Sequence, residues 1–343
     1  MDLHQFLSRP PGNTCLPGQE SLQKRLLEKL ASSKNIALAA PRGCGKRMLQ
    51  KEVGHALMEQ NEDLKTFYIE LNYKESPASF LIRFSRELCK SMSIRPPDKQ
   101  QGNDPDFKLL DLPEKIATRK KIRIVIFISN FEYTRQYEDY WHVLRKFSLF
   151  WKNHHRCTYS ISSNNQYILN ELLQNTTRPL LGFGRPYSLQ RNPHVSFTSY
   201  IRGLFLNGDK MIDADAAQSI ASKTDRHLFY LHLLSWHAFM KTYRTCTVSI
   251  VDEAYKELVY HYEPQVKEMI DKLTKNQFNY LRALLNHTEK ICSRASLEHY
   301  ELGKSSNIAR VKHSLIMKGI IEIQVGKARI VNPLLTCWIE NLV

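Results

Sequence analysis

A short apolar segment, residues 35–40, leads directly into a loop that holds two glycines and a lysine, and a helical pattern follows at once. The loop reads Ala40-Pro-Arg-Gly-Cys-Gly-Lys-Arg47. Glycines let a backbone curl so that several N–H groups face one side, and the first turn of a helix adds the positive end of its dipole. A strand, such a loop and a helix in this order predict a phosphate-binding loop.

The loop departs from the usual pattern G-x-x-x-x-G-K-[ST] at both ends. Ala40 replaces the first glycine, which is a mild change where the backbone dihedrals are ordinary. Arg47 replaces the Ser or Thr whose hydroxyl helps to hold Mg²⁺, and an arginine cannot ligate a metal. Arg47 therefore either turns away, or supplies the positive charge that the metal would bring, or belongs to a basic turn that binds nothing. The candidate nucleotide-binding residues are Pro41, Arg42, Gly43, Cys44, Gly45, Lys46 and Arg47.

The most apolar segment of the chain, residues 122–128, is typical of a central strand buried on both faces. A metal-holding aspartate and a water-activating glutamate are expected directly after such a strand. Ser129 and Asn130 take these two places, and the nearest carboxylate, Glu132, comes two or three residues later. Together with Arg47, these replacements argue against Mg²⁺ and against hydrolysis by the usual route. No confident catalytic residue remains.

Strands alternate with helical patterns up to about residue 190, which predicts an α/β fold with a parallel sheet covered by helices on both faces. The predicted strands are 35–40, 66–71, 122–128, 157–161 and 185–190. From residue 197 to residue 262 the pattern is wholly helical. We therefore expect a P-loop domain over 1–190 and a helical lid over 191–262.

The segment from 263 to 343 changes pattern again. Thr274 is expected to cap a first helix, a short second helix follows, and Ser305 or Ser306 is expected to cap a third. Two short strands, 320–325 and 328–331, then surround a turn in which Gly326 is the first residue. Three helices followed by a hairpin predict a winged helix-turn-helix domain.

Composition narrows the classes of partner. The net charge of +15 favours polyanions such as nucleotide or nucleic acid. The longest apolar runs are far shorter than the roughly 20 residues that a membrane helix needs, so no membrane partner is expected. Seven cysteines without paired spacing indicate reduced thiols and a cytoplasmic protein. The His-His-Arg-Cys run at 154–157 lacks a second pair at ligand spacing, so no metal site is predicted.

The order of these parts resembles the archaeal-type ATPase family, a branch of the AAA+ and STAND P-loop NTPases. Its members show G-P-R-R-x-G-K-T, then four apolar residues and D-E-F-Q, then a lid and a winged helix. This chain matches the two motifs at Pro41, Arg42, Gly45, Lys46 and Phe131. It departs from them at Arg47, Ser129, Asn130 and Glu132.

The resemblance extends to later segments. Ser163 and Asn164 follow the next strand, where the family has a polar sensor of the γ-phosphate. Arg185 closes a segment similar to the family's P-L-x-G-R. Residues 224–231 resemble the lid motif T-G-G-H-P-x-Y, and residues 332–338 resemble the closing D-P-x-x-x-x-W. Ser163, Asn164 and Arg185 are therefore the candidate sensors.

The resemblance implies a nucleotide-controlled switch. With the replaced residues, it predicts a STAND-like switch or scaffold that binds ATP or ADP, a pseudo-ATPase with impaired or absent hydrolysis. One alternative is a slow Mg²⁺-dependent ATPase that uses Glu132. Another is a DNA-binding regulator whose P-loop domain is only structural, and the winged helix could equally bind a protein partner. The candidate contacts to double-stranded DNA are Lys304, Asn307, Arg310, His313, Lys327 and Arg329.

Overall fold

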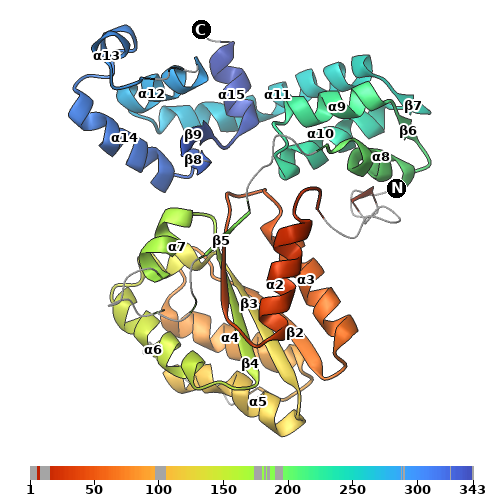
Figure 1. Ribbon diagram of the computed structural model, residues 1–343, viewed down its shortest axis with the longest axis vertical. Helices are drawn as coiled ribbons and strands as arrows, with labels where there is room; N and C mark the ends of the chain where they lie inside the picture. Colours follow the sequence, from red (N-terminus) through yellow and green to blue (C-terminus); the bar gives the residue numbers. More distant parts are fainter. Residues whose placement is uncertain are drawn as a thin grey trace. The chain divides into compact units, whose positions relative to one another are not determined.

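The computed structural model describes residues 6–7, 16–96, 106–173, 180, 183, 186–189, 196–286, 288, 290–324 and 326–341. The chain forms two compact units. One consists of residues 19–42 and 46–189, and the other of residues 1–18, 43–45 and 190–343. Figure 1 labels the elements of both units, which are described separately below.

The first unit contains a five-stranded sheet in the order β2-β3-β4-β1-β5, in which all neighbours are parallel. Its strands are β1 (Ile36–Ala39), β2 (Leu64–Glu70), β3 (Arg123–Ser129), β4 (Cys157–Ser163) and β5 (Tyr187–Ser188). The predicted parallel α/β architecture is confirmed. Because the strands run in the same direction, their carboxyl ends lie at a common edge of the sheet.

The helices of the first unit connect these strands. They are α2 (Glu20–Ala31), α3 (Lys46–Gln60), α4 (Pro77–Ser91), α5 (Leu112–Lys120), α6 (Tyr140–Lys152) and α7 (Gln166–Leu173), with short 3-10 helices η1 (Phe107–Asp111) and η2 (Phe131–Gln136). Alternate residues of β3 point to opposite faces of the sheet. Ile124, Ile126 and Ile128 belong to the core cluster that also includes buried side chains of α4, α5, α6 and α7. Val125 and Phe127, which point to the opposite face, are buried as well, so burial on both faces explains why residues 124–128 are all apolar.

The other face of the sheet packs closely against α3. Tyr68 of β2 stacks on Phe127 of β3, with ring centroids 4.7 Å apart. A Cβ atom at Gly54 of α3 would lie only 2.0 Å from the hydroxyl oxygen of Tyr68. Glycine at this position therefore lets α3 approach the sheet, and α3 carries the lysine of the phosphate-loop motif at its first residue.

The second unit is mainly helical. It contains α8 (Thr198–Leu206), α9 (Ala214–Lys223), α10 (Leu228–Lys241), α11 (Val248–Asp271), α12 (Lys275–Leu285), α13 (Arg294–His299), α14 (Ser305–Met317) and α15 (Pro333–Glu340). The prediction that 197–262 is wholly helical is wrong, because β6 (Met211–Ile212) pairs in parallel with β7 (Thr245–Cys246). Strands of two residues are too short to produce an alternating pattern in the sequence.

Three helices and an antiparallel hairpin, β8 (Ile321–Gln324) with β9 (Lys327–Ile330), occur in the predicted order after residue 274. Thr274 caps α12 in a capping box with Gln277, as predicted. The residue before α14 is Lys304, so neither Ser305 nor Ser306 is its cap. Lys327 belongs to β9 and pairs with Gln324, so it is not part of the turn in the way the prediction had it, and Gly326 has a φ of +78°. Glycine adopts this left-handed φ without strain.

The division into three domains stays a prediction, as does the winged-helix assignment. α11 runs without interruption through the predicted boundary between residues 262 and 263. No helix in the described ranges is both long enough and apolar enough to cross a bilayer.

Candidate nucleotide site

The phosphate-loop motif begins at the carboxyl end of β1, beside the end of β4. The backbone N–H of Ala40 donates to the carbonyl oxygen of Ser163 at 3.2 Å. Gly43 and Gly45 have φ values of +74° and +90°, which L side chains rarely adopt. Ala40 does not have a positive φ, so an alanine in place of the motif's first glycine causes no backbone strain. Gly45, the motif glycine that the chain keeps, and Gly43 within the loop are thus the two loop positions at which the backbone needs a glycine.

Lys46 is the first residue of α3, and its ammonium group turns back over the loop. It donates to the carbonyl oxygens of Ala40 and Pro41 at 2.6 and 3.3 Å. It also donates to Asn164 Oδ1 at 2.7 Å. Asn164, a sensor candidate 118 residues later in the chain, is therefore in direct contact with the lysine that would bind phosphate.

Asn164 joins Lys46 to the residues that follow β3. Its backbone N–H donates to Glu132 Oε2 at 3.1 Å, and its side-chain amide donates to Glu132 Oε1 at 2.6 Å. The same amide donates to Asn130 Oδ1 at 3.2 Å. Asn130 has a left-handed φ of 58°, and η2 starts after it. This bend after β3 brings Glu132 to the end of β4, although Glu132 is displaced along the sequence.

Ser129 and Ser163 lie at the ends of β3 and β4. Ser129 is half-buried, and the hydroxyl group of Ser162 donates to it at 3.4 Å. Ser163 is fully buried, and its hydroxyl group contacts Asn165 twice, by donating to the carbonyl oxygen at 3.1 Å and by accepting from the N–H at 3.0 Å. Ser163 thus stabilises the turn into α7. Arg185, the third sensor candidate, lies outside the described residues.

Arg47 forms an ion pair with Glu70, the last residue of β2. Arg47 Nη1 lies 2.5 Å from Glu70 Oε1, and the two side chains are 69% and 40% exposed. Glu70 Oε2 also accepts a long hydrogen bond of 3.5 Å from the side-chain amide of Asn130. Glu70 was not among the residues that the sequence singled out. Its place at the end of a predicted strand was the available signal, because parallel strands end at a common edge.

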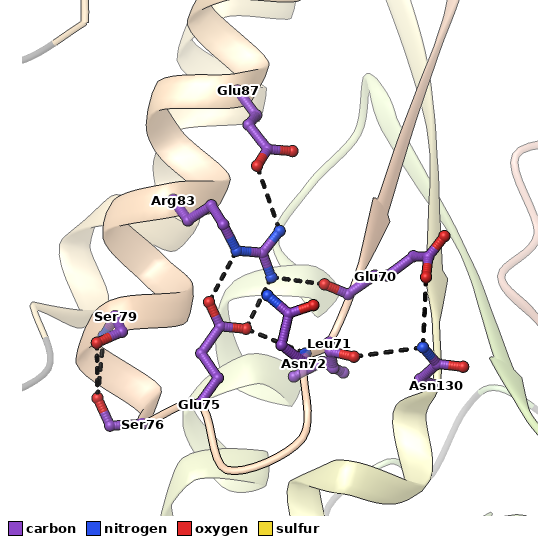
Figure 2. A network of polar contacts seen from close by, with 9 residues as sticks. All are labelled: Glu70, Leu71, Asn72, Glu75, Ser76, Ser79, Arg83, Glu87 and Asn130. Atoms are coloured by element: carbon purple, nitrogen blue, oxygen red, sulfur yellow. Dashed lines mark hydrogen bonds and ion pairs between the residues drawn. The ribbon is translucent and has the colours of Figure 1, made fainter.

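A network of charged groups fixes the segment that carries Glu70, as Figure 2 shows. Arg83 of α4 donates to the backbone oxygen of Glu70 at 2.6 Å. It also donates to both carboxylate oxygens of Glu75 at 2.7 Å and to Glu87 at 3.3 Å. The hydrogen bond to Glu75 is the main cause that raises the pKa of Arg83. The loop between β2 and α4 is therefore held by a bidentate pair, the stronger kind of ion pair.

Several residues of this network line a cavity of about 270 Å³. Its lining includes Arg47 and Glu70, Ser129 at the end of β3, and Arg83 with Glu87 on α4. Arg47 and Ser129 therefore line one cavity. These are the side chains that occupy the two positions where a hydroxyl and an aspartate would hold a metal.

Arg42 lies at the exposed rim of the loop. Its guanidinium group donates to the hydroxyl oxygen of Tyr133 at 2.9 Å. Tyr133 in turn packs edge-on against Tyr73, with ring centroids 5.7 Å apart. Tyr73 is 66% exposed. The rim of the candidate site is thus basic and aromatic.

A group of three potential metal ligands occurs at the opposite, amino-terminal end of β4. Glu114, His154 and Cys157 each offer a ligand atom within 4.8 Å of the others. Both oxygens of Glu114, however, accept backbone N–H bonds of 3.0 to 3.1 Å from residues 155–157. Burial lowers the pKa of His154 and raises the pKa of the Cys157 thiol. We assign Glu114 to anchoring the turn that leads into β4.

The candidate DNA-contacting residues lie at the start of α14, on α14 and on the hairpin of the second unit. Lys304, Arg310, His313 and Lys327 are exposed, and Asn307 is half-buried. Arg329 is also half-buried; it forms an ion pair with Asp225 and donates to Gln324 at 3.1 Å. The structure therefore engages Arg329 in contacts within its own unit.

No protein-family model matches the chain, and no curated protein matches its sequence. Solved structures do match. A Walker-type ATPase of Pyrococcus abyssi is 11% identical with a TM-score of 0.72, covering 98% of this chain and 99% of that one. The ORC2 protein of Aeropyrum pernix, solved with ADPNP and ADP, is 13% identical with a TM-score of 0.67, covering 99% and 97%.

A third match is the ORC1 protein of Aeropyrum pernix in complex with DNA. It is 15% identical with a TM-score of 0.57, and the match covers 99% of this chain and 95% of that chain. Identities this low relate folds and do not transfer activities. With the parallel sheet described above, these matches show that the chain has the α/β P-loop NTPase fold, as the sequence predicted.

Proposed function

We propose that this protein binds ATP or ADP through residues 41–47 and hydrolyses it slowly or not at all, so that it acts as a nucleotide-dependent switch or scaffold. The observation that carries the proposal is the position of Lys46, whose ammonium group lies over the loop and contacts Asn164. An ammonium group and curled loop amides are the donors that a polyphosphate needs. The ADPNP and ADP bound by the similar ORC2 protein support this reading.

The side chains at the metal position do not fit Mg²⁺. This ion prefers carboxylate and water oxygens in octahedral geometry. The chain offers the neutral hydroxyl of Ser129 and the amide of Asn130. The carboxylate that lies beside them, Glu70, is already paired with the guanidinium group of Arg47. No step of the proposed function therefore depends on this metal.

Hydrolysis also lacks a suitable base. Asn130 stands at the position of the water-activating glutamate, and a neutral amide cannot accept a proton. Glu132 is the nearest carboxylate in the sequence, but both of its oxygens accept hydrogen bonds from Asn164. Slow hydrolysis with Glu132 as the base remains the alternative, and a long incubation of the protein with ATP and Mg²⁺ tests it. Turnover that disappears in Glu132→Gln would favour the slow ATPase.

Calorimetric titration with ATP and with ADP, each in Mg²⁺ and in EDTA, tests the proposal. Lys46→Ala should weaken nucleotide binding by at least about tenfold, because a charge-assisted contact to phosphate is lost. Lys51→Ala, which changes an exposed lysine further along α3, should leave the affinity unchanged. Equal nucleotide affinities in Lys46→Ala and Lys51→Ala would show that Lys46 does not bind the phosphates.

A second candidate function is binding of double-stranded DNA by the C-terminal segment, which we propose is a winged helix. The exposed basic residues Lys304, Arg310 and Lys327 favour it, as does the DNA bound by the similar ORC1 protein. Arg310→Ala should weaken salt-sensitive duplex binding roughly threefold or more. Arg294→Ala, on the neighbouring helix α13 and 93% exposed, is the matched control. If duplex binding responds neither to salt nor to Arg310→Ala or Arg294→Ala, the result would favour a protein partner for this segment.

A further inference from the structure

The ion pair between Arg47 and Glu70 lies where the sequence has lost its metal-binding residues. Glu70 is the register partner of Ser129 across β2 and β3. It lies 2.5 Å from Arg47 and accepts from Asn130 at 3.5 Å. One carboxylate that the motifs do not specify is thus adjacent to all three replaced positions.

We infer that Arg47 is a built-in cation that takes the place of the divalent metal, and that Glu70 is the counter-ion which a nucleotide phosphate displaces. The site would then take nucleoside polyphosphates in their metal-free form. The inference rests on the proposed function, since it assumes that Lys46 and the loop bind phosphate. It adds the form of the ligand and the residue that competes with it.

Charge explains why the pair excludes a metal. A divalent cation at Glu70 would stand beside the guanidinium group of Arg47, which has the same sign of charge and already pairs with that carboxylate. A metal at Ser129 would share the cavity with the same guanidinium group. Metal binding therefore requires that Arg47 leave, whereas phosphate binding requires only that Arg47 change its partner.

The exchange of partners is physically accessible. The Arg47 side chain is 69% exposed, and ion pairs between exposed groups are weak. A terminal phosphate carries more negative charge than a carboxylate and offers an arginine bidentate contacts. Arg83 holds the backbone of Glu70 by donating to its carbonyl oxygen at 2.6 Å, and the Glu70 side chain is less exposed than that of Arg47, at 40%. Arg47 is therefore the member of the pair that moves.

Titration of the full chain with ATP in EDTA tests the inference. Glu70→Gln should tighten metal-free ATP binding roughly two- to tenfold, because it removes both the competitor for Arg47 and a repulsive charge. Glu87→Gln is a closely matched control. Its carboxylate lines the same cavity and is 42% exposed, against 40% for Glu70, but its ion pair is with Arg83. This variant should bind ATP as the unchanged protein does.

The pairwise role of Arg47 is tested by repeating Glu70→Gln in an Arg47→Ala background. If Glu70 acts by holding Arg47, most of its effect should vanish there. If Glu70→Gln tightens ATP binding just as much in the Arg47→Ala background, Glu70 acts only by repelling phosphate, and the inference is overturned. An unchanged or weaker affinity in Glu70→Gln alone would overturn it as well.

Failure of the inference can be separated from failure of the proposed function. If the unchanged protein binds ATP through Lys46 but Glu70→Gln has no effect, only the inference fails. If Glu70→Gln binds ATP in EDTA but the unchanged protein does not, Glu70 is confirmed as the competitor. In that case the proposed nucleotide binding by the unchanged protein is wrong. If neither binds, both are wrong.

Discussion

Lys46 donates a hydrogen bond of 2.7 Å to the side-chain oxygen of Asn164, which lies 118 residues further along the chain. This contact couples the lysine of the loop to the end of β4. Through Asn164 it also couples Lys46 to Glu132, which receives two hydrogen bonds from that asparagine. A polar network thus links the phosphate-loop motif to the ends of two strands.

Replacing Asn164 tests whether this network prepares Lys46 for its ligand. Asn164→Ala should weaken ATP binding about fivefold, which corresponds to the roughly 1 kcal/mol that a typical hydrogen bond contributes. Calorimetry on the full chain measures the change. Asn153→Ala, an exposed asparagine at the end of α6, is the control and should have no effect. Tighter binding in Asn164→Ala would mean that Asn164 competes with phosphate for Lys46.

The approach of α3 to the sheet depends on Gly54. Gly54→Ala should destabilise the protein by about 1–3 kcal/mol, because the new methyl group would meet the hydroxyl oxygen of Tyr68 at 2.0 Å. Urea unfolding measures this loss. Tyr68→Phe removes that hydroxyl and should restore part of the stability in the double variant. A double variant no more stable than Gly54→Ala would place the clash elsewhere.

Glu114 anchors the turn before β4 with hydrogen bonds from three backbone N–H groups. Glu114→Ala leaves these donors without their acceptor and should cost about 2 kcal/mol of unfolding free energy. Glu59→Ala, on an exposed position of α3, should cost far less. A loss of bound zinc in Glu114→Ala, detected by metal analysis, would instead reveal a metal role for the group with His154 and Cys157.

His232 makes the stability of the protein depend on pH. Burial lowers its pKa to about 4 in the folded protein, against about 6.5 when the chain is unfolded. Between these values the unfolded state binds more protons, so stability is complete above pH 6.5 and is lost as the pH falls toward 4. The loss approaches about 3 kcal/mol at pH 4.

Urea unfolding at a series of pH values checks this expectation. His232→Gln keeps a hydrogen-bonding group near the hydroxyl group of Tyr200, which lies 2.7 Å from the histidine ring, and should flatten the dependence on pH. His299→Gln, at an exposed position on α13, should leave the dependence as it is. An unchanged slope in His232→Gln would assign the acid sensitivity to other groups.

The C-terminal segment shows which local features can be predicted. Thr274 caps α12, as expected. The hairpin was predicted one residue out of place, because Gly326 suits either position of a two-residue turn and cross-strand pairing decides between them. The predicted N-cap of α14 was also wrong, because two adjacent serines do not show at which residue the helix begins.

The sequence by itself determined the parallel α/β sheet, the strand–loop–helix around Lys46, and the three replaced positions at Arg47, Ser129 and Asn130. These features depend on residue type and on short-range periodicity, which the chain carries locally. The tertiary structure alone decided that Lys46 contacts Asn164 and that Arg47 contacts Glu70. Asn164 and Glu70 lie at the ends of other strands. Which of these side chains contacts Lys46 or Arg47 is fixed only when the parallel strands bring their ends to one edge of the sheet. Sequence spacing contains no information about that choice.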